Sequence, residues 1–225
     1  MDQPRRKAAP RAQGEDNGAI ALPSPAPKSR HAKAKAPVSR PKKAVKSSSK
    51  GRNPHPVDAK TRAEIFRRLS EANPEPRSDL EYRDPYTLLV AVVLSAQATD
   101  AGVNKATRRL FAQADTPEAM VALGEDAVRE LIRTIGLYRA KAKNVIALSR
   151  ILVEQYGGAV PPSRAALEAL PGVGKKTAAV VVNIAFGEPT IAVDTHIFRV
   201  SNRIPLAIAR TADAMEAALT PIVPD

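Results

Sequence analysis

Two glycines, two lysines and an aspartate form the pattern with the clearest chemical potential in this 225-residue sequence. The segment Gly172-Val173-Gly174 can form a tight turn, because glycine accepts positive φ angles and its missing side chain lets a phosphate approach the backbone N–H groups. Lys175 and Lys176 follow at the start of an apolar segment, and Asp194 comes eighteen residues after Lys176. Together these residues can bind a nucleic-acid phosphate and provide an amine nucleophile next to a carboxylate.

The two lysines stand where a helix is expected to begin, and cations are unfavourable there by about 0.3–1 kcal/mol each. Residues that are locally unfavourable, such as these two lysines at a helix start, often mark a functional site. We expect Lys175 to face phosphate and Lys176 to line a cleft, where burial and the helix dipole favour a neutral, nucleophilic amine. Val173 should point inward and hold the turn. The alternative is an ordinary helix hairpin, with two solvated lysines and glycines that only end a helix.

Asp194 follows an apolar segment and precedes another expected helix. A carboxylate there can stabilise positive charge that develops on a sugar and can exchange protons with an amine. Its simpler role is the N-cap of the helix, and both roles can hold at once. His196 lies two residues further on, and a single histidine near a helix start is more often structural than catalytic.

The positive charge of the chain is concentrated at its N-terminus. Residues 1–55 hold fourteen Lys and Arg against three acidic residues, so they account for nearly all of the formal net charge of +12. This segment is rich in Pro, Ala and Ser and poor in large apolar residues, which predicts a disordered basic tail attracted to nucleic acid. A solubilising extension and a targeting address are the alternatives.

The sequence contains no cysteine, so disulfides, thiolate metal sites and iron–sulfur clusters cannot form within it. No apolar run approaches the roughly 18 residues that a membrane-spanning helix needs. These two observations favour a cytoplasmic protein that does not bind membranes and that is associated with the nucleoid if it is bacterial.

From residue 57 onward, apolar residues recur with helical spacing, and cap residues and glycines mark the ends of the segments. We expect an all-α protein of about ten short helices without strands. Asp100 is expected to cap the third. The expected helices cover 58–73, 86–96, 103–111, a short one opening at 116–118, 126–134, 141–156, 164–170, 176–186, one from 194 or 195, and 211–219.

Four segments resemble the endonuclease III family of the helix-hairpin-helix DNA glycosylase superfamily. The similarity runs from about residue 59 to the end, and four matches in the same order make chance an unlikely cause. The segments are Leu-Ser-Ala-Gln-Ala-Thr-Asp at 94–100, Thr-Ile-Gly-Leu-Tyr at 134–138, the turn with its flanks at 167–178, and Pro-Thr-Ile-Ala-Val-Asp-Thr-His-Ile-Phe-Arg-Val at 189–200.

The resemblance implies a monomeric, bifunctional DNA glycosylase and abasic-site lyase, which removes oxidised pyrimidines from double-stranded DNA in base excision repair. The damaged base would be flipped out of the duplex. Lys176 would attack the sugar C1′ and cut the strand by β-elimination through a Schiff base, with Asp194 as the second catalytic residue and no metal in the chemistry. Damaged pyrimidines and abasic sites in duplex DNA are therefore the expected substrates.

The resemblance also implies DNA contacts. Gln97 and Leu137 would fill the vacated stack and wedge the opposite strand, whereas the residues alone suggest only a polar helix end and a loop hydrophobe. The DNA-binding turn would consist of Gly172, Val173, Gly174 and Lys175.

The implied fold has two helical domains with the active site between them. A six-helix domain with the hairpin would cover 78–188, and a second domain would combine 57–77 with 189–225. Members of the family continue beyond this point to four cysteines that hold a four-iron four-sulfur cluster, which these residues cannot bind. We therefore expect a truncated second domain, with apolar surface exposed on the helix at 58–73.

Two other functions stay open. One is a truncated, catalytically inactive DNA-binding module that acts through its tail and hairpin. The other is an adenine-mismatch glycosylase of the same superfamily, although that subfamily lacks the lysine at the position of Lys176.

Overall fold

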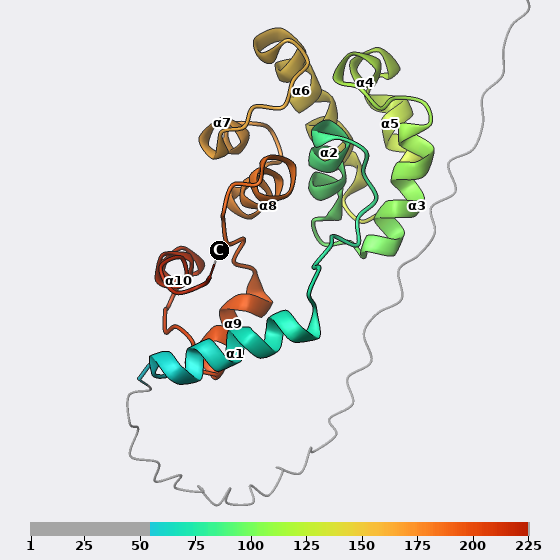
Figure 1. Cartoon of the computed structure of the whole chain (residues 1–225). Coiled ribbons are helices and arrows are strands. Elements are labelled where there is room, and N and C mark those ends of the chain that lie inside the picture. The colour runs from blue at the N-terminus through green and yellow to red at the C-terminus, as the bar shows by residue number, and fades with distance from the viewer. Residues whose placement is uncertain (1–54, 225) are drawn as a thin grey trace, which may run out of the picture. The chain divides into compact units, whose positions relative to one another are not determined.

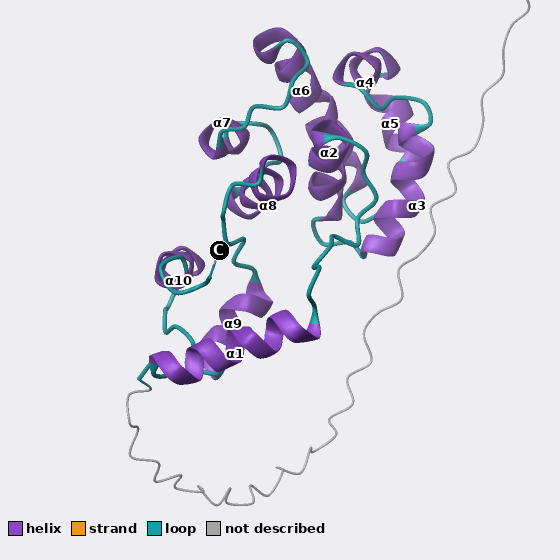
Figure 2. Ribbon diagram, in the orientation of Figure 1, coloured by secondary structure: helices purple, strands orange, loops and turns teal. Residues whose placement is uncertain are grey.

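The structure is a computed structural model that describes residues 55–224, and this range contains ten α-helices and no strand (Figures 1 and 2). The all-α prediction is therefore confirmed. The segment predicted to be a disordered basic tail, 1–55, lies outside the described residues except for His55. None of the described helices is long and apolar enough to cross a membrane.

The longest connection between the helices is the segment 73–84, between the first helix and the second. They are α1 (Ala59–Ala72), α2 (Pro85–Ser95), α3 (Asp100–Phe111), α4 (Pro117–Leu123), α5 (Glu125–Leu131), α6 (Tyr138–Tyr156), α7 (Arg164–Glu168), α8 (Lys175–Phe186), α9 (Thr195–Arg203) and α10 (Ala212–Leu219).

Two helices, α3 and α6, begin three residues earlier than predicted. The cap of α3 is Thr99 and not Asp100, because the Thr99 hydroxyl accepts a hydrogen bond from the Gly102 N–H at 3.3 Å. Helix α6 begins at Tyr138, earlier than expected, since Leu137 adopts a left-handed conformation with φ of 59° and turns the chain directly into the helix.

Helix α2 forms the centre of the main hydrophobic cluster. Its residues 86–94 are all buried, and it packs against α3, α6 and α8 (Figure 1). A capping box fixes its start, since the Thr87 N–H donates to Asp84 Oδ1 at 2.8 Å and the Asp84 N–H donates to the Thr87 hydroxyl at 3.1 Å. Buried residues of α8 belong to this cluster, which therefore fixes the position of the helix that begins with Lys175 and Lys176.

A second hydrophobic cluster is built on Leu206, Ala207, Met215 and Leu219. Residues of α1 and of the segment before α9 pack on it, among them Phe66 and Val193. No residue of α1 is itself buried, and its Leu69 side chain is 59% exposed. The apolar exposure expected of this helix is thus present, and the division into two domains at 77/78 and 188/189 stays a prediction.

Candidate active site

The turn between α7 and α8 is held by contacts that glycine alone permits. Gly172 has a φ of 80°, in the left-handed region. A Cβ atom at this position would lie 2.7 Å from Asn144 Nδ2 and 2.9 Å from Asn144 Cβ, so that no larger residue fits without movement. Val173 is buried in the main cluster, and its N–H donates to the Leu170 carbonyl at 3.1 Å. The turn is therefore held on its core side by Val173, while Gly174 lies on its solvent side.

Gly174 forms the open side of this turn. It is the N-cap of α8, makes no side-chain cap hydrogen bond, and has no neighbour within 4 Å of where a Cβ atom would stand. The protein therefore leaves the side of Gly174 where a side chain would stand uncovered. The first N–H groups at a helix N-terminus bind anions, including phosphate.

Lys176 and Asp194 lie next to each other. Lys176 Nζ is 3.4 Å from Asp194 Oδ2. The other carboxylate oxygen, Oδ1, accepts hydrogen bonds from the N–H groups of His196 and Ile197, both at 2.9 Å, and so caps α9. The same side chain thus starts a helix with one oxygen and faces the amine with the other.

The ionisation of Asp194 follows from these contacts. Partial burial raises the pKa of its carboxyl, but the hydrogen bond from Ile197, the charge and hydrogen bond of Lys176, and the hydrogen bond from His196 outweigh it. The net effect is a pKa below the ordinary value. Asp194 is therefore an anion at neutral pH.

The predicted burial of Lys176 is wrong. Its side chain is 56% exposed, whereas that of Asp194 is 29% exposed. Lys176 lies in the first turn of α8, ahead of the buried positions of that helix, which begin at Ala178. The protein itself therefore does not shield this amine, and exclusion of water from it requires a bound ligand.

Both side chains line a cleft of ≈ 980 Å³. Gln97 and His196 line the same cleft, and so does Arg210, a residue that the sequence does not predict to be part of the site. Arg210 lies in the connection before α10 and belongs to no motif, so no signal in the sequence could identify it. Its charge makes this wall of the cleft attractive to a polyanion.

Gln97 and Leu137 share an uncommon backbone conformation. Their φ angles are 55° and 59°, and left-handed conformations are rare for residues other than glycine. The loops that carry them meet, because a Cβ atom on Gly136 would lie 3.7 Å from the Gln97 carbonyl oxygen. The Leu137 side chain is 60% exposed. The structure thus brings Leu137 close to the cleft, although only Gln97 lines it.

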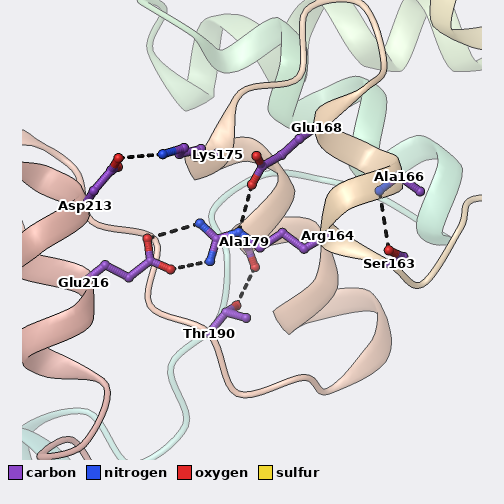
Figure 3. Close-up of polar contacts among 9 residues, drawn as sticks. All are labelled: Ser163, Arg164, Ala166, Glu168, Lys175, Ala179, Thr190, Asp213 and Glu216. Atoms are coloured by element: carbon purple, nitrogen blue, oxygen red, sulfur yellow. Dashed lines mark hydrogen bonds and ion pairs between the residues drawn. The ribbon is translucent and has the colours of Figure 1, made fainter.

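Lys175 is paired with an acidic side chain of α10. Its amine lies 2.5 Å from Asp213 Oδ2 on α10 (Figure 3), and this hydrogen bond and charge raise the pKa of Lys175. Both partners are well exposed, so the pair exchanges readily with solvent or with another anion.

The residues present do not fit the iron–sulfur cluster that the family implies. The sequence has no cysteine to supply thiolates. Among residues 55–224, no group of three or more His, Cys, Asp or Glu side chains is arranged to hold a metal ion.

Comparison with known proteins agrees with this geometry. Residues 90–225 match the family described as HhH-GPD superfamily base excision DNA repair protein. Endonuclease III of Escherichia coli (strain K12) is 57% identical over 163 residues, which are 72% of this chain and 77% of the relative. The Haemophilus influenzae endonuclease III is 55% identical, over 73% of this chain and 78% of the relative.

The chain belongs to the endonuclease III family. A solved structure described as a trapped endonuclease III–DNA covalent intermediate matches with a TM-score of 0.71 and 43% sequence identity, over 75% of this chain and 79% of the other. A non-covalent endonuclease III–DNA complex matches equally well. As a member of the endonuclease III family, the protein is a DNA glycosylase and abasic-site lyase of base excision repair.

Proposed function

We propose that this enzyme removes oxidised pyrimidines from duplex DNA and then cuts the strand at the abasic site by β-elimination, with Lys176 as nucleophile and Asp194 as its partner. The observation that carries the proposal is the 3.4 Å separation between Lys176 Nζ and Asp194 Oδ2 in a cleft of ≈ 980 Å³. A similar solved structure supports the proposal, because it is described as an endonuclease III trapped in a covalent intermediate with DNA.

The first step needs a neutral amine. The Asp194 carboxylate is within reach of the Lys176 ammonium and accepts its proton, directly or through one water. Because the amine is open to solvent in the free protein, bound DNA must exclude water before this transfer is favourable. Lys176 Nζ then bonds to C1′ of the flipped nucleotide, while the C1′–N bond breaks and the base leaves with the proton that Asp194 had accepted, so that Asp194 becomes an anion again.

The second step cuts the strand. The sugar ring opens to a Schiff base between Nζ and C1′, which acidifies the hydrogens on C2′. Loss of a C2′ proton to a base and breakage of the C3′–O bond release the 3′ phosphate, and water hydrolyses the Schiff base to free the amine. The anionic Asp194 stabilises the positive charge that develops on the sugar and on the imine. These steps use no metal and no cofactor.

The remaining predicted residues hold the DNA. The open N–H groups at Gly172 and Gly174 bind a backbone phosphate, and Val173 keeps the turn in place from the core side. When DNA binds, Lys175 leaves Asp213 and contacts a neighbouring phosphate. Gln97 and Leu137 fill the gap left by the flipped nucleotide. We expect the enzyme to act as a monomer and to work where its DNA substrate is, in the cytoplasm and at the nucleoid if the cell is bacterial.

Borohydride reduction of the Schiff base tests the proposal. Full-length wild-type protein mixed with a thymine-glycol duplex should give a covalent protein–DNA adduct, and Lys176→Ala should give none. Lys175→Ala is the matched control, because it removes the neighbouring amine, which contacts phosphate only; with enzyme in excess over duplex it should still give the adduct. The proposal fails if wild type gives no adduct or if Lys176→Ala gives as much.

The same assay separates the two other functions. An inactive DNA-binding module would bind duplex with a strong salt dependence and would cut none of it. An adenine-mismatch glycosylase would release adenine from a mismatch in preference to thymine glycol.

A further inference from the structure

The two proposed catalytic groups belong to different hydrophobic clusters. Lys176 lies on α8, whose buried face is part of the main cluster. Asp194 directly follows Val193, which packs on the second cluster together with residues of α9 and α10. The distance between amine and carboxylate therefore depends on how α10 and its cluster are attached to the hairpin helices.

An arginine–glutamate pair makes this attachment. Arg164 on α7 donates through Nη1 to Glu216 Oε1, and through Nη2 to Glu216 Oε2 at 3.1 Å, so that the planar guanidinium grips both carboxylate oxygens of α10 (Figure 3). The two side chains are 27% and 20% exposed. Partial burial reduces screening by salt, and a two-bond grip fixes direction as well as distance.

Arg164 is also held from its own helix. Its Nε donates to Glu168 Oε1 at 2.9 Å. The hydrogen bond to Glu216 is the largest influence on the guanidinium and raises the pKa of Arg164 despite its partial burial. The arginine is thus a permanently charged group with a fixed orientation towards α10.

Other polar links between the same parts are weaker or lie elsewhere. Lys175 and Asp213 are 59% and 66% exposed, and exposed pairs contribute between zero and about 1 kcal/mol. The Thr190 hydroxyl donates to the Ala179 carbonyl at 2.8 Å, which holds the beginning of the segment leading to Asp194 but not α10 (Figure 3).

We propose that Arg164 and Glu216 form a positioning latch, which holds α10 on the hairpin and thereby keeps Asp194 within reach of Lys176. The latch residues do not touch the substrate and act only through the separation of the two catalytic groups. This inference rests on the proposed function for its catalytic consequence, whereas the attachment itself is independent of any activity.

The variant Glu216→Gln tests the latch, because it keeps the shape of the side chain and removes its charge. Glu168→Gln is the matched control, since it removes a carboxylate from the same guanidinium with a similar exposure but within α7. Arg164→Lys is a second test variant that keeps the charge and loses the two-bond grip. Thermal unfolding shows whether each variant folds. If Glu216→Gln does not fold, Arg164→Lys is used in its place, and the reverse.

The first measurement is a distance. Because the sequence has no cysteine, spin labels can be attached to Arg150→Cys on α6 and Ala214→Cys on α10 in the full-length chain. The distance distribution should be narrow in the otherwise wild-type protein, broad or longer with Glu216→Gln, and narrow with Glu168→Gln. An unchanged distribution with Glu216→Gln, or the same broadening with Glu168→Gln, overturns the latch.

The second measurement is the single-turnover rate of strand cleavage on an abasic-site duplex, compared with the KM for the same duplex. Misplacement of reacting groups by about 1 Å can lower rates by on the order of 100-fold. Glu216→Gln should therefore lower the cleavage rate by about 10-fold or more and leave KM nearly unchanged. A broader distance distribution with a wild-type rate overturns the positioning role. If wild type itself cuts no DNA, the proposed function fails and the distance measurement still tests the latch.

Discussion

Lys176 Nζ lies 3.4 Å from Asp194 Oδ2, although the backbone segments that carry them pack in different hydrophobic clusters. The carboxylate is held by two backbone N–H groups of α9, while the amine projects from the exposed first turn of α8. One partner is thus fixed by local hydrogen bonds and the other by the position of a helix. Substitutions should affect the two partners in different ways.

Asp194→Asn and Asp194→Ala should separate folding from chemistry. Asparagine is as good an N-cap as aspartate, whereas alanine costs about 0.5–2 kcal/mol at this position. We expect Asp194→Asn to keep most of the free energy of unfolding and Asp194→Ala to lose about that amount. Both should lower the rate of borohydride-trapped adduct formation by at least about 10-fold, because both remove the charge beside Lys176. Urea unfolding and single-turnover trapping measure the two effects, and equal destabilisation by both variants would contradict the capping role.

The stability contributed by the Asp194 charge should depend on pH. The folded pKa of Asp194 lies below its ordinary value of 3.8. A carboxyl group of this kind stabilises the folded state above its unfolded pKa, and the contribution is lost as pH falls through the folded pKa. The difference in free energy of unfolding between wild type and Asp194→Asn should therefore shrink below about pH 4 and stay constant near neutral pH. A difference that grew on acidification would reverse the sign and refute the assignment.

Gly172 and Gly174 should respond differently to alanine. Gly172→Ala adds a methyl group at a φ of 80° and 2.7 Å from Asn144 Nδ2, which should cost about 2 kcal/mol or more. Gly174→Ala meets open space and should cost less than about 1 kcal/mol, since alanine is only a poorer N-cap. Its added methyl group should nevertheless weaken duplex binding, because it stands where a phosphate approaches the backbone. Denaturant unfolding and a salt titration of binding test this, and wild-type affinity for Gly174→Ala would exclude the turn as a phosphate site.

Lys141 should make the protein less stable than an apolar side chain would. It is 4% exposed, its amine has no hydrogen-bond partner among the described residues, and burial lowers its pKa. Lys141→Met should therefore raise the free energy of unfolding by about 1 kcal/mol or more. The gain should be full below the folded pKa of the lysine and should vanish as pH rises past the ordinary value of 10.5.

The neighbouring Lys143 provides the control for this substitution. It lies on the same helix and is exposed, so Lys143→Met should change stability by less than about 0.5 kcal/mol. Destabilisation by Lys141→Met would show that the buried amine has a favourable partner after all.

The helix starts could be predicted from the sequence wherever a side chain bonds to its own helix. Asp84, Thr116, Ser163 and Thr211 all act as caps within three residues of the N–H that they accept from. Such signals are local, so a single sequence contains them. The four segments of the family resemblance identified Lys176 and Asp194 in the same way, because each lies in a contiguous motif.

Features that depend on distant contacts could not be predicted. Arg164 and Glu216 are 52 residues apart, and neither lies in a recognised motif. Gln97 and Leu137 adopt left-handed backbone conformations that the local preference for glycine would not predict. The apolar run after Lys176 predicts burial of its side chain, whereas the buried face of α8 begins only at Ala178 and leaves Lys176 exposed.

Helix α1 is held on the protein by few buried contacts. None of its residues is buried, whereas residues 86–94 of α2 all are. Local opening costs least where few apolar contacts are lost. Amide hydrogens of α1 should accordingly exchange with deuterium first and those of α2 last. Phe66 of α1 packs on the same cluster as Val193. Fraying of α1 would therefore weaken the packing of the segment that carries Asp194, while Lys176 stayed in place. Enzyme activity should accordingly be lost on warming before the whole protein unfolds.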